Sequence, residues 1–546
     1  MSKPSLPGPT IGSRSMLSVS TLLTATLCIA LGSAIPASAQ ETNPPSLELS
    51  PCHLDNYRQE VLCGTFTVFE NRAAANGRSL DIQVAVLPAV DETKEPDPIV
   101  YFAGGPGQSA IDSAALMRGI FREANGKRDI VLVDQRGMGR SHPLQCDDME
   151  ESLENEAGKM GLEEVLALSR ELLQSCAASL GEDQNLKLYT QDLANADIHD
   201  ILRALGYEKV NLFGISWGTR SALLYAHRYP EQVRSVILDG NLPLDNTAPL
   251  HAAADGDAAL RALLDDCATD AACNAAFPDL RADFDRALAR IGDGLSIALP
   301  NPLTGEPMEF LLTRDRFGDV LRTVLYSSEM SRLLPILIQK TADGDDRPFM
   351  GLSFLGAGMS SSMTIGATLA IFCAEEFGRM EPEDIDDALA EERQIGVQMI
   401  QNLQNACSVW PTADVPSIYS EDVRSEAPAL VLSGAVDPIT PPRWGDRMAT
   451  VLPNALHLTA PTVGHNVSPV GCAPDLLKQF IEQGHHDGLD GSCLDELKRP
   501  SFFVDTAGPA VPKAEPEADD DDDDDGDGDD DDDEQSENTD GEEAAR

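Results

Sequence analysis

Residues 214–218, Gly-Ile-Ser-Trp-Gly, constrain the fold of this 546-residue chain more than any other segment. The pentapeptide follows a short apolar run at 210–213 and precedes a stretch with helical periodicity at 219–228. Two glycines let the backbone turn sharply from a strand into a helix, which lifts the hydroxyl of Ser216 above the edge of a sheet. This context favours a nucleophile; the alternative is a tight turn with an incidental serine.

The surrounding pattern predicts an α/β protein with a doubly wound, mostly parallel sheet, because strands alternate with helices. The expected strands are residues 61–69, 80–87, 98–102, 129–134, 210–213, 233–238, 429–433 and 455–458. Between them, from about residue 247, the chain becomes helical and rich in Ala and Leu, with one hairpin expected from 295–299 and 310–313. We interpret this block as a mainly helical cap inserted into the sheet domain.

The predicted organisation has five parts. They are a signal peptide at 1–39, core segments at 40–246 and 428–498, a helical cap at 247–427, and a disordered acidic tail at 499–546. The leader combines Lys3 and Arg14 with an apolar stretch and a small-residue cleavage site at 37–39. An uncleaved anchor is the alternative. We expect a protein exported to the periplasm or the extracellular space, without a membrane span after the leader is removed.

The tail is strongly acidic and lacks the apolar residues needed for a core. Residues 514–546 contain 20 Asp or Glu residues against a single Arg, including an uninterrupted run at 519–525. The tail accounts for less than half of the net charge of −51, so the body is acidic in its own right. Nucleic acid and anionic membrane are poor partners for such a surface.

Ten cysteines remain once Cys28 of the leader is set aside, and they fall as neighbours along the chain. In an oxidising compartment this spacing suggests five short-loop disulfides, although connectivity cannot be proved from sequence. A metal site is disfavoured, since there is no Cys-x-x-Cys and no histidine at ligand spacing. The candidates are Cys52, Cys63, Cys146, Cys176, Cys267, Cys273, Cys373, Cys407, Cys472 and Cys493.

A serine nucleophile needs a base and a group that orients the base. His465 has the best context, in a Gly-His-Asn loop after the strand expected at 455–458. Asp437 lies four residues past the strand expected at 430–433. The order Ser216, Asp437, His465 matches the order found on doubly wound hydrolytic sheets. The alternatives are a turn aspartate and a structural histidine.

The oxyanion of such a reaction needs backbone N–H donors. We predict one from Trp217, directly after the nucleophile, and others from Gly104 and Gly105 in a glycine loop after an early strand. A phosphate cradle is the rival interpretation of that loop. It is disfavoured because the loop lacks the Gly-Lys-Ser/Thr ending of a nucleotide-binding P-loop.

These motifs together resemble the proline iminopeptidase and tripeptidyl aminopeptidase family of α/β-hydrolases, from about Cys52 to Cys493. The segments that carry the resemblance are residues 104–107, 134–141, 214–218, 434–441 and 464–465. The family releases amino acids or short peptides from free N-termini, and its cap supplies carboxylates for the substrate's ammonium group. The best matched carboxylates are Glu375 and Glu376; a solvated acidic turn is the alternative. Ala103 departs from the residues that many relatives carry before the glycine loop.

The resemblance therefore implies an exported serine aminopeptidase that acts on peptides with free N-termini and needs no metal or organic cofactor. A carboxylesterase or lipase on the same fold is the nearest alternative, because fold does not fix substrate. A cation-binding scaffold with an acidic tail is a third, disfavoured by the absence of EF-hand spacing. The number of residues released and the oligomeric state stay open.

Overall fold

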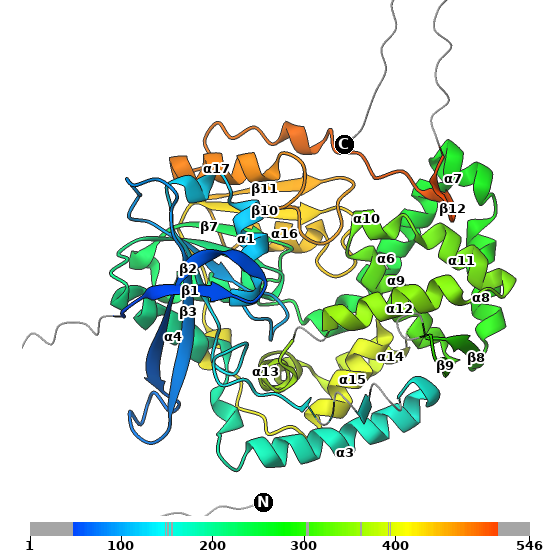
Figure 1. The fold of residues 1–546 in the computed structure, drawn as a ribbon, viewed down its shortest axis with the longest axis horizontal. Helices are drawn as coiled ribbons and strands as arrows, with labels where there is room; N and C mark the ends of the chain where they lie inside the picture. Colours follow the sequence, from blue (N-terminus) through cyan, green and yellow to red (C-terminus); the bar gives the residue numbers. More distant parts are fainter. Residues whose placement is uncertain are drawn as a thin grey trace, which may run out of the picture. The chain divides into compact units, whose positions relative to one another are not determined.

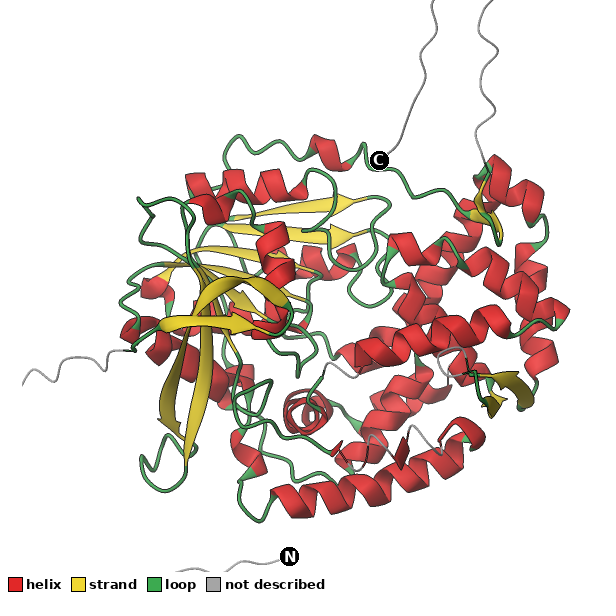
Figure 2. Cartoon of the chain, viewed as in Figure 1, coloured by secondary structure: helices red, strands yellow, loops and turns green. Residues whose placement is uncertain are grey.

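The computed structural model describes residues 47–510, except residues 148, 150–151, 154–156, 302–304, 361–362, 391–392 and 394, and without the side chains of 354–360. The signal peptide predicted at 1–39 lies outside these residues, as does most of the predicted tail. Figures 1 and 2 show a sheet with flanking helices and, inserted after β7, a separate group of helices. The prediction of an α/β fold with a mostly parallel sheet is confirmed.

Nine strands of the described chain form one sheet in the order β1-β2-β3-β5-β4-β6-β7-β10-β11. The strands from β5 through β11 are parallel, whereas β1, β2 and β3 form an antiparallel edge. Their bounds are β1 Ser50–Leu54, β2 Tyr57–Phe69, β3 Ser79–Leu87, β4 Ile99–Phe102, β5 Ile130–Val133, β6 Val210–Ile215, β7 Val233–Asp239, β10 Ala429–Gly434 and β11 Ala455–Ala460.

The central strands are continuous apolar runs because helices cover both faces of the sheet. Side chains of β4 alternate between two cores: Val100 joins α4 and α5 on one face, and Tyr101 joins α1 and α17 on the other. The helices that cover the sheet are α1 Ala114–Ile120, α4 Gln191–Ala204, α5 Trp217–Arg228, α16 Pro442–Ala449 and α17 Ala473–Gln483. Helix α3 Leu162–Leu180 precedes the inserted segment in sequence but packs against α15 Val397–Cys407 of the cap (Figure 1). Strand β1 and helices α1, α3 and α17 were not predicted from the sequence.

The inserted cap has its own apolar core, which includes Leu263, Phe317, Leu337 and Phe349. The predicted hairpin is present, with β8 Leu295–Pro300 paired to β9 Pro307–Leu312. The cap helices are α6 Ala248–Thr269, α7 Ala271–Ala276, α8 Leu280–Ile291, α9 Arg314–Leu325, α10 Ser328–Ser331, α11 Leu334–Asp343, α12 Arg347–Ser360, α13 Ile365–Ile371, α14 Pro382–Ala390 and α15 Val397–Cys407. A π-helical turn, η6 Phe372–Glu376, continues α13.

Residues 499–510 correct the predicted start of the disordered tail. They form a small hairpin of β12 Phe503–Asp505 and β13 Gly508–Pro509 that packs against the cap. Phe502 is buried in the cap core, and the Phe503 N–H donates to the carbonyl of Arg332 at 3.2 Å. An apolar side chain that can be buried explains why the ordered chain extends beyond residue 498.

The ten described cysteines form five disulfides, each between neighbours along the chain, as their spacing suggested. The pairs are Cys52–Cys63, Cys146–Cys176, Cys267–Cys273, Cys373–Cys407 and Cys472–Cys493. Closing such loops removes conformational freedom from the unfolded chain and stabilises each region locally. Among the described residues, no helix is both long and apolar enough to cross a membrane.

Candidate active site

The candidate site lies where the order of the parallel strands reverses. The chain passes from β4 to β5 on one side of β4 and then to β6 on its other side. In open α/β sheets this reversal creates a crevice beyond the carboxyl ends of the two strands. Phe102 at the end of β4 is paired with Gly214 of β6. The glycine loop after β4 and Ser216 after β6 therefore emerge side by side.

Ser216 occupies a strained turn between β6 and α5, with φ 56° and ψ −121°. Positive φ is costly for a residue with a side chain and persists only where the surroundings enforce it. Here Gly214 and Gly218 let neighbouring backbone segments approach closely enough to enforce the turn. A Cβ on Gly214 would lie 2.3 Å from the carbonyl oxygen of Gly218, and a Cβ on Gly218 would lie 1.9 Å from that of Phe102.

The glycine loop after β4 lies beside the serine. A Cβ built on Gly104 would lie 3.3 Å from the Cβ of Ser216 and 3.2 Å from the carbonyl oxygen of Ile215. Gly104 therefore lies directly beside the serine, as does Trp217, the next residue in the chain, whereas Gly105 has Gly107 and Gln108 as its nearest neighbours. Ala103, the departure from the family pattern, is buried in the sheet core.

His465 and Asp437 are brought together from loops after adjacent strands. Residues 434 and 460 end β10 and β11 as a register pair, and His465 Nδ1 lies 2.8 Å from Asp437 Oδ2. Burial favours the neutral carboxyl, but the charge and hydrogen bond of His465, with further donors from Thr440, hold the pKa of Asp437 below its usual 3.8. Burial opposes protonation of the imidazole, yet the charge and hydrogen bond of Asp437 raise the pKa of His465 above 6.5.

Thr440 is a site residue that the sequence analysis missed. Its hydroxyl donates to Asp437 Oδ2 at 2.6 Å and lies 3.0 Å from His465 Nδ1. The backbone N–H groups of Ile439 and Thr440 donate to Asp437 Oδ1, both at 2.8 Å. The carboxylate is consequently fixed in orientation and ionised. A threonine three residues after the aspartate is the sequence signal that could have found it.

Asp134, in the Asp-Gln-Arg-Gly segment, anchors the chain that follows the glycine loop. Its Oδ1 accepts hydrogen bonds from the Ser109 hydroxyl at 2.7 Å and the Ile111 N–H at 3.0 Å. Its Oδ2 accepts from the N–H of Arg140 at 2.9 Å. In the sequence this segment is recognisable only as a family motif, whereas in the structure Asp134 fixes the end of the glycine loop.

The cap contacts both halves of the site. The Thr364 N–H donates to the carbonyl of Gly107 at 3.0 Å, and the Thr368 hydroxyl donates to that of Pro106 at 2.6 Å. On the other side, the Tyr326 ring meets the His465 imidazole edge-on at 5.0 Å, and the His465 N–H donates to the Tyr326 carbonyl at 2.9 Å. The cap therefore supports the glycine loop and the histidine directly.

A cavity of about 240 Å³ opens beside His465, and its wall is shared between the cap and the sheet domain. The cap contributes Tyr326, Ser327, Ser328 and Glu329, and the remaining lining comes from residues 462–466, 469–470, 497–498 and 500. No group of His, Cys, Asp or Glu side chains within the described chain is arranged to hold a metal ion.

The prediction that Glu375 and Glu376 bind a substrate ammonium does not fit their surroundings. Both side chains are fully buried rather than in a solvated turn. Glu375 accepts from the Gln191 N–H at 2.7 Å and from the Tyr419 hydroxyl at 2.6 Å. Glu376 pairs with Arg220 and accepts from the Ala248 N–H at 2.9 Å. Protein donors occupy all four carboxylate oxygens, so none is open to a substrate.

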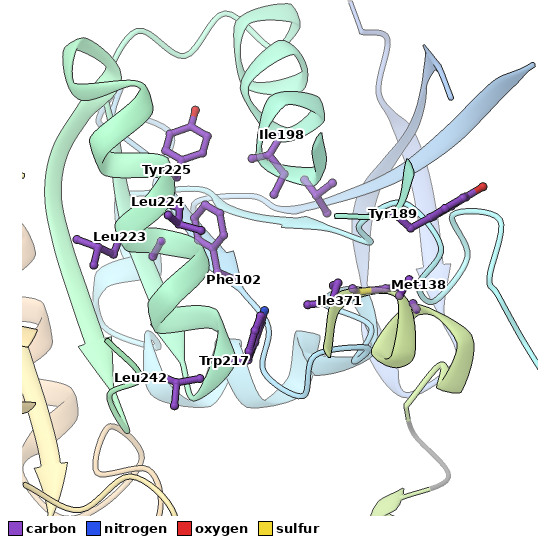
Figure 3. Close-up of a cluster of buried hydrophobic side chains, with 14 of the residues drawn as sticks. Phe102, Met138, Tyr189, Ile198, Trp217, Leu223, Leu224, Tyr225, Leu242 and Ile371 are labelled. Carbon is purple, nitrogen blue, oxygen red and sulfur yellow. The ribbon is translucent and has the colours of Figure 1, made fainter. Parts of the chain in front are cut away.

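The two glutamates instead tie the cap to α4 and α5 of the sheet domain. The Arg220 guanidinium lies 4.7 Å from the centre of the Trp217 ring, and the Trp217 indole N–H donates to the Gln191 side chain at 3.1 Å. Figure 3 shows Trp217 at the start of α5, with Phe102 from the sheet and Ile371 from the cap in the same buried cluster. We call Arg220, Glu375 and Glu376 the cap latch.

Comparisons with known proteins agree with this architecture. A family model described as the alpha/beta hydrolase fold matches residues 97–297, and one described as TAP-like protein matches residues 392–493. The serine protease Hip1 of Mycobacterium tuberculosis is 24% identical over 481 residues, covering 82% of this chain and 91% of the relative.

Two shorter matches cover part of each chain. The tripeptidyl aminopeptidase of Streptomyces lividans is 27% identical over 207 residues, 35% of this chain and 38% of the relative. The proline iminopeptidase of Neisseria gonorrhoeae is 32% identical over 152 residues, 28% of this chain and 35% of the relative. The chain belongs to the α/β-hydrolase fold family, in the group of serine peptidases that includes tripeptidyl aminopeptidases and proline iminopeptidases.

Proposed function

We propose that this protein is an exported serine aminopeptidase in which Ser216 is the nucleophile, His465 the general base and Asp437 the residue that orients the base. The observation that carries the proposal is the 2.8 Å contact between His465 and Asp437 at the sheet edge that also holds Ser216 in a strained turn. A free serine hydroxyl is a poor nucleophile at neutral pH, so this arrangement has a direct chemical use.

The proposed reaction is acyl transfer. Ser216 attacks the scissile carbonyl while His465 removes the hydroxyl proton, and the developing oxyanion accepts hydrogen bonds from the N–H groups around Gly104 and Trp217. His465 then protonates the leaving amine. Water, activated by the same histidine, releases the acyl group. Asp437 stabilises the imidazolium and fixes its Nδ1 as the protonated nitrogen.

Action at free N-termini rests on the relatives named tripeptidyl aminopeptidase and proline iminopeptidase and on the match to the TAP-like model. An inserted cap that contacts the glycine loop and the histidine is compatible with exopeptidase action, because a covered site admits chain ends more readily than folded chains. A carboxylesterase on the same fold is the second candidate function. It needs the same Ser216, His465 and Asp437 but no group for an ammonium.

Export is supported by the five disulfides, which persist in oxidising compartments. The leader at residues 1–39 supplies the targeting signal that such a route requires. Fractionation of cells that produce the chain, with N-terminal sequencing of the product, tests both statements. A mature protein that begins at Gln40 outside the cytoplasm is expected, and an unprocessed cytoplasmic product would contradict export.

The activity test uses the full chain produced by secretion in an oxidising host. Substrates are amides of proline, alanine and short tripeptides with free N-termini, their N-blocked counterparts, and a short-chain ester. We expect cleavage of the free-amine amides only. Activity should disappear in Ser216→Ala and persist in Ser179→Ala, an exposed serine on α3. Ester cleavage without amide cleavage would support the esterase instead.

A further inference from the structure

Asp239 is a fully buried carboxylate at the carboxyl end of β7, between the strand that carries Ser216 and the strand that leads to Asp437. It is paired with Ile215 of β6 on one side and with Leu432 of β10 on the other. Asp239 contacts both Ser216 and the loop that carries His465.

The main chain of Asp239 holds the nucleophile. The Ser216 N–H donates to the carbonyl oxygen of Asp239 at 2.9 Å. This bond continues the β6–β7 ladder by one residue into the strained turn, so it helps to impose the positive φ of Ser216.

The side chain of Asp239 holds the loop that carries the base. Asn466, directly after His465, has φ 75°, which turns the chain sharply. The next two N–H groups, of Val467 and Ser468, point back and donate to the two Asp239 oxygens at 2.9 and 2.8 Å. Burial raises the pKa of Asp239 above its usual 3.8. The two N–H donors and the charge of His465 act in the opposite direction, because they favour the ionised form of the carboxyl group.

Gly240, the residue after Asp239, lies directly against the imidazole of His465. A Cβ built on Gly240 would lie 2.9 Å from His465 Cε1 and 3.2 Å from its Nδ1. We propose that Asp239 is a positioning residue that sets the base against the nucleophile, and that it supplies a second negative charge to the imidazolium beside that of Asp437. This inference rests on the proposed roles of Ser216 and His465.

The charges around His465 agree with the inference. Burial is the largest influence on the pKa of His465 and lowers it. The charge of Asp437 raises this pKa, and the charge of Asp239 raises it further. The third neighbour is the Tyr326 ring from the cap, whose hydroxyl accepts from Arg322 at 3.4 Å. Asp239 also faces Tyr101 of β4, where burial, with a contribution from the Asp239 charge, raises the tyrosine pKa to about 12.

The test measures how fast a fluorophosphonate labels Ser216 in the full chain as a function of pH. This probe requires the nucleophile and its base but no particular substrate. A wild-type chain that is not labelled refutes the proposed roles of Ser216 and His465. A labelled wild type with an unaffected Asp239→Asn variant refutes only the inference about Asp239.

In Asp239→Asn the amide group presents N–H to a backbone N–H, so one hydrogen bond and the charge are lost. We expect the labelling rate at the optimum pH to fall at least tenfold. We also expect the acid limb, the fall in labelling rate on the acid side of the optimum, to move to lower pH, because a charge that raises the His465 pKa is gone. The matched control is Asp97→Asn, a buried carboxylate at the opposite end of the sheet that pairs with Arg128 and Asn211.

The control should lower thermal stability without moving the acid limb. If Asp239→Asn behaves like the control, with an unmoved limb, Asp239 is only structural and the inference is overturned. If Asp239→Asn does not fold, Asp239→Glu decides, since it keeps the charge but displaces the loop. Slower labelling at an unmoved limb then supports the inference, and wild-type labelling overturns it.

Discussion

The cap latch allows one perturbation whose result separates a structural pair from a substrate-binding site. Arg220 is completely buried, and burial lowers its pKa to about 10. Glu376→Ala would remove the ion-pair partner of Arg220 and leave Glu375 as the remaining negative charge of the latch. It would also remove the partner of Arg379, which bonds Glu376 at 3.1 Å. The carbonyl oxygens of Leu242 and Pro243 still accept from the Arg220 guanidinium, which limits the penalty.

Breaking a buried ion pair from one side costs roughly 3–5 kcal/mol. The remaining carbonyl acceptors argue for the lower end, about 3 kcal/mol. The orphaned N–H of Ala248 adds about 1 kcal/mol, as for other buried donors that lose their acceptor. We therefore expect Glu376→Ala to reduce the free energy of unfolding by about 4 kcal/mol. The double variant Arg220→Met with Glu376→Leu removes both charges and should recover most of this loss, because well-packed apolar replacements of ion pairs are often neutral.

The assay combines chemical denaturation followed by circular dichroism with KM values for free-amine and N-blocked substrates. If the pair only fastens the cap, the double variant regains stability and the ratio of the two KM values stays as in the wild type. A double variant that is stable but has lost its preference for free amines would refute the structural interpretation. It would return Glu376 to the role that the sequence analysis gave it.

Three further outcomes are expected. Because Asp437 raises the pKa of His465 above 6.5, kcat/KM should fall as the pH drops through a value above 6.5. Asp437→Asn should move this acid side of the pH–activity profile to lower pH and reduce kcat by about 10⁴. A profile whose acid side does not move would contradict the pairing of Asp437 with His465. Thr440→Val removes a hydroxyl bonded to a charged carboxylate, worth about 2 kcal/mol, so kcat should drop roughly thirtyfold with little change in KM; an unchanged kcat in a steady-state assay would show that the hydroxyl is dispensable. Replacing Cys373 and Cys407 by alanine opens a loop of sequence separation 34, and urea denaturation should show a loss of about 3.8 kcal/mol; a loss under 1 kcal/mol would mean that the unfolded state is already restricted there.

The fold was accessible from the sequence, and candidate catalytic residues could be selected from it, because the signals used are local. The turn at 214–218 is recognisable from two glycines between a strand and a helix. Strands β10 and β11 are short apolar runs, and Asp437 and His465 lie in the loops that follow them. Helical periodicity likewise separated the cap from the sheet. Each of these inferences needed only a window of about ten residues.

The missing parts depend on contacts between distant segments. Glu376 looks like an acidic surface residue until Arg220, 156 positions away, is placed against it. Tyr326 and His465 meet only because the cap folds over the sheet edge. Asp239 ends an ordinary strand. Its contact with the His465 loop is visible only in the structure, where the N–H of Val467, 228 positions later, donates to its carboxylate. Residue type and spacing do not reveal such pairs.

The disulfides carry a consequence for biogenesis. Numbered along the chain, the ten described cysteines pair first with second, third with fourth, and so on, without interleaving. A polypeptide threaded N-terminus first across a membrane would expose each partner before the following pair emerged. An oxidase that joins cysteines in order of appearance would therefore suffice, with no shuffling step, and maturation of this protein should be indifferent to loss of a disulfide isomerase.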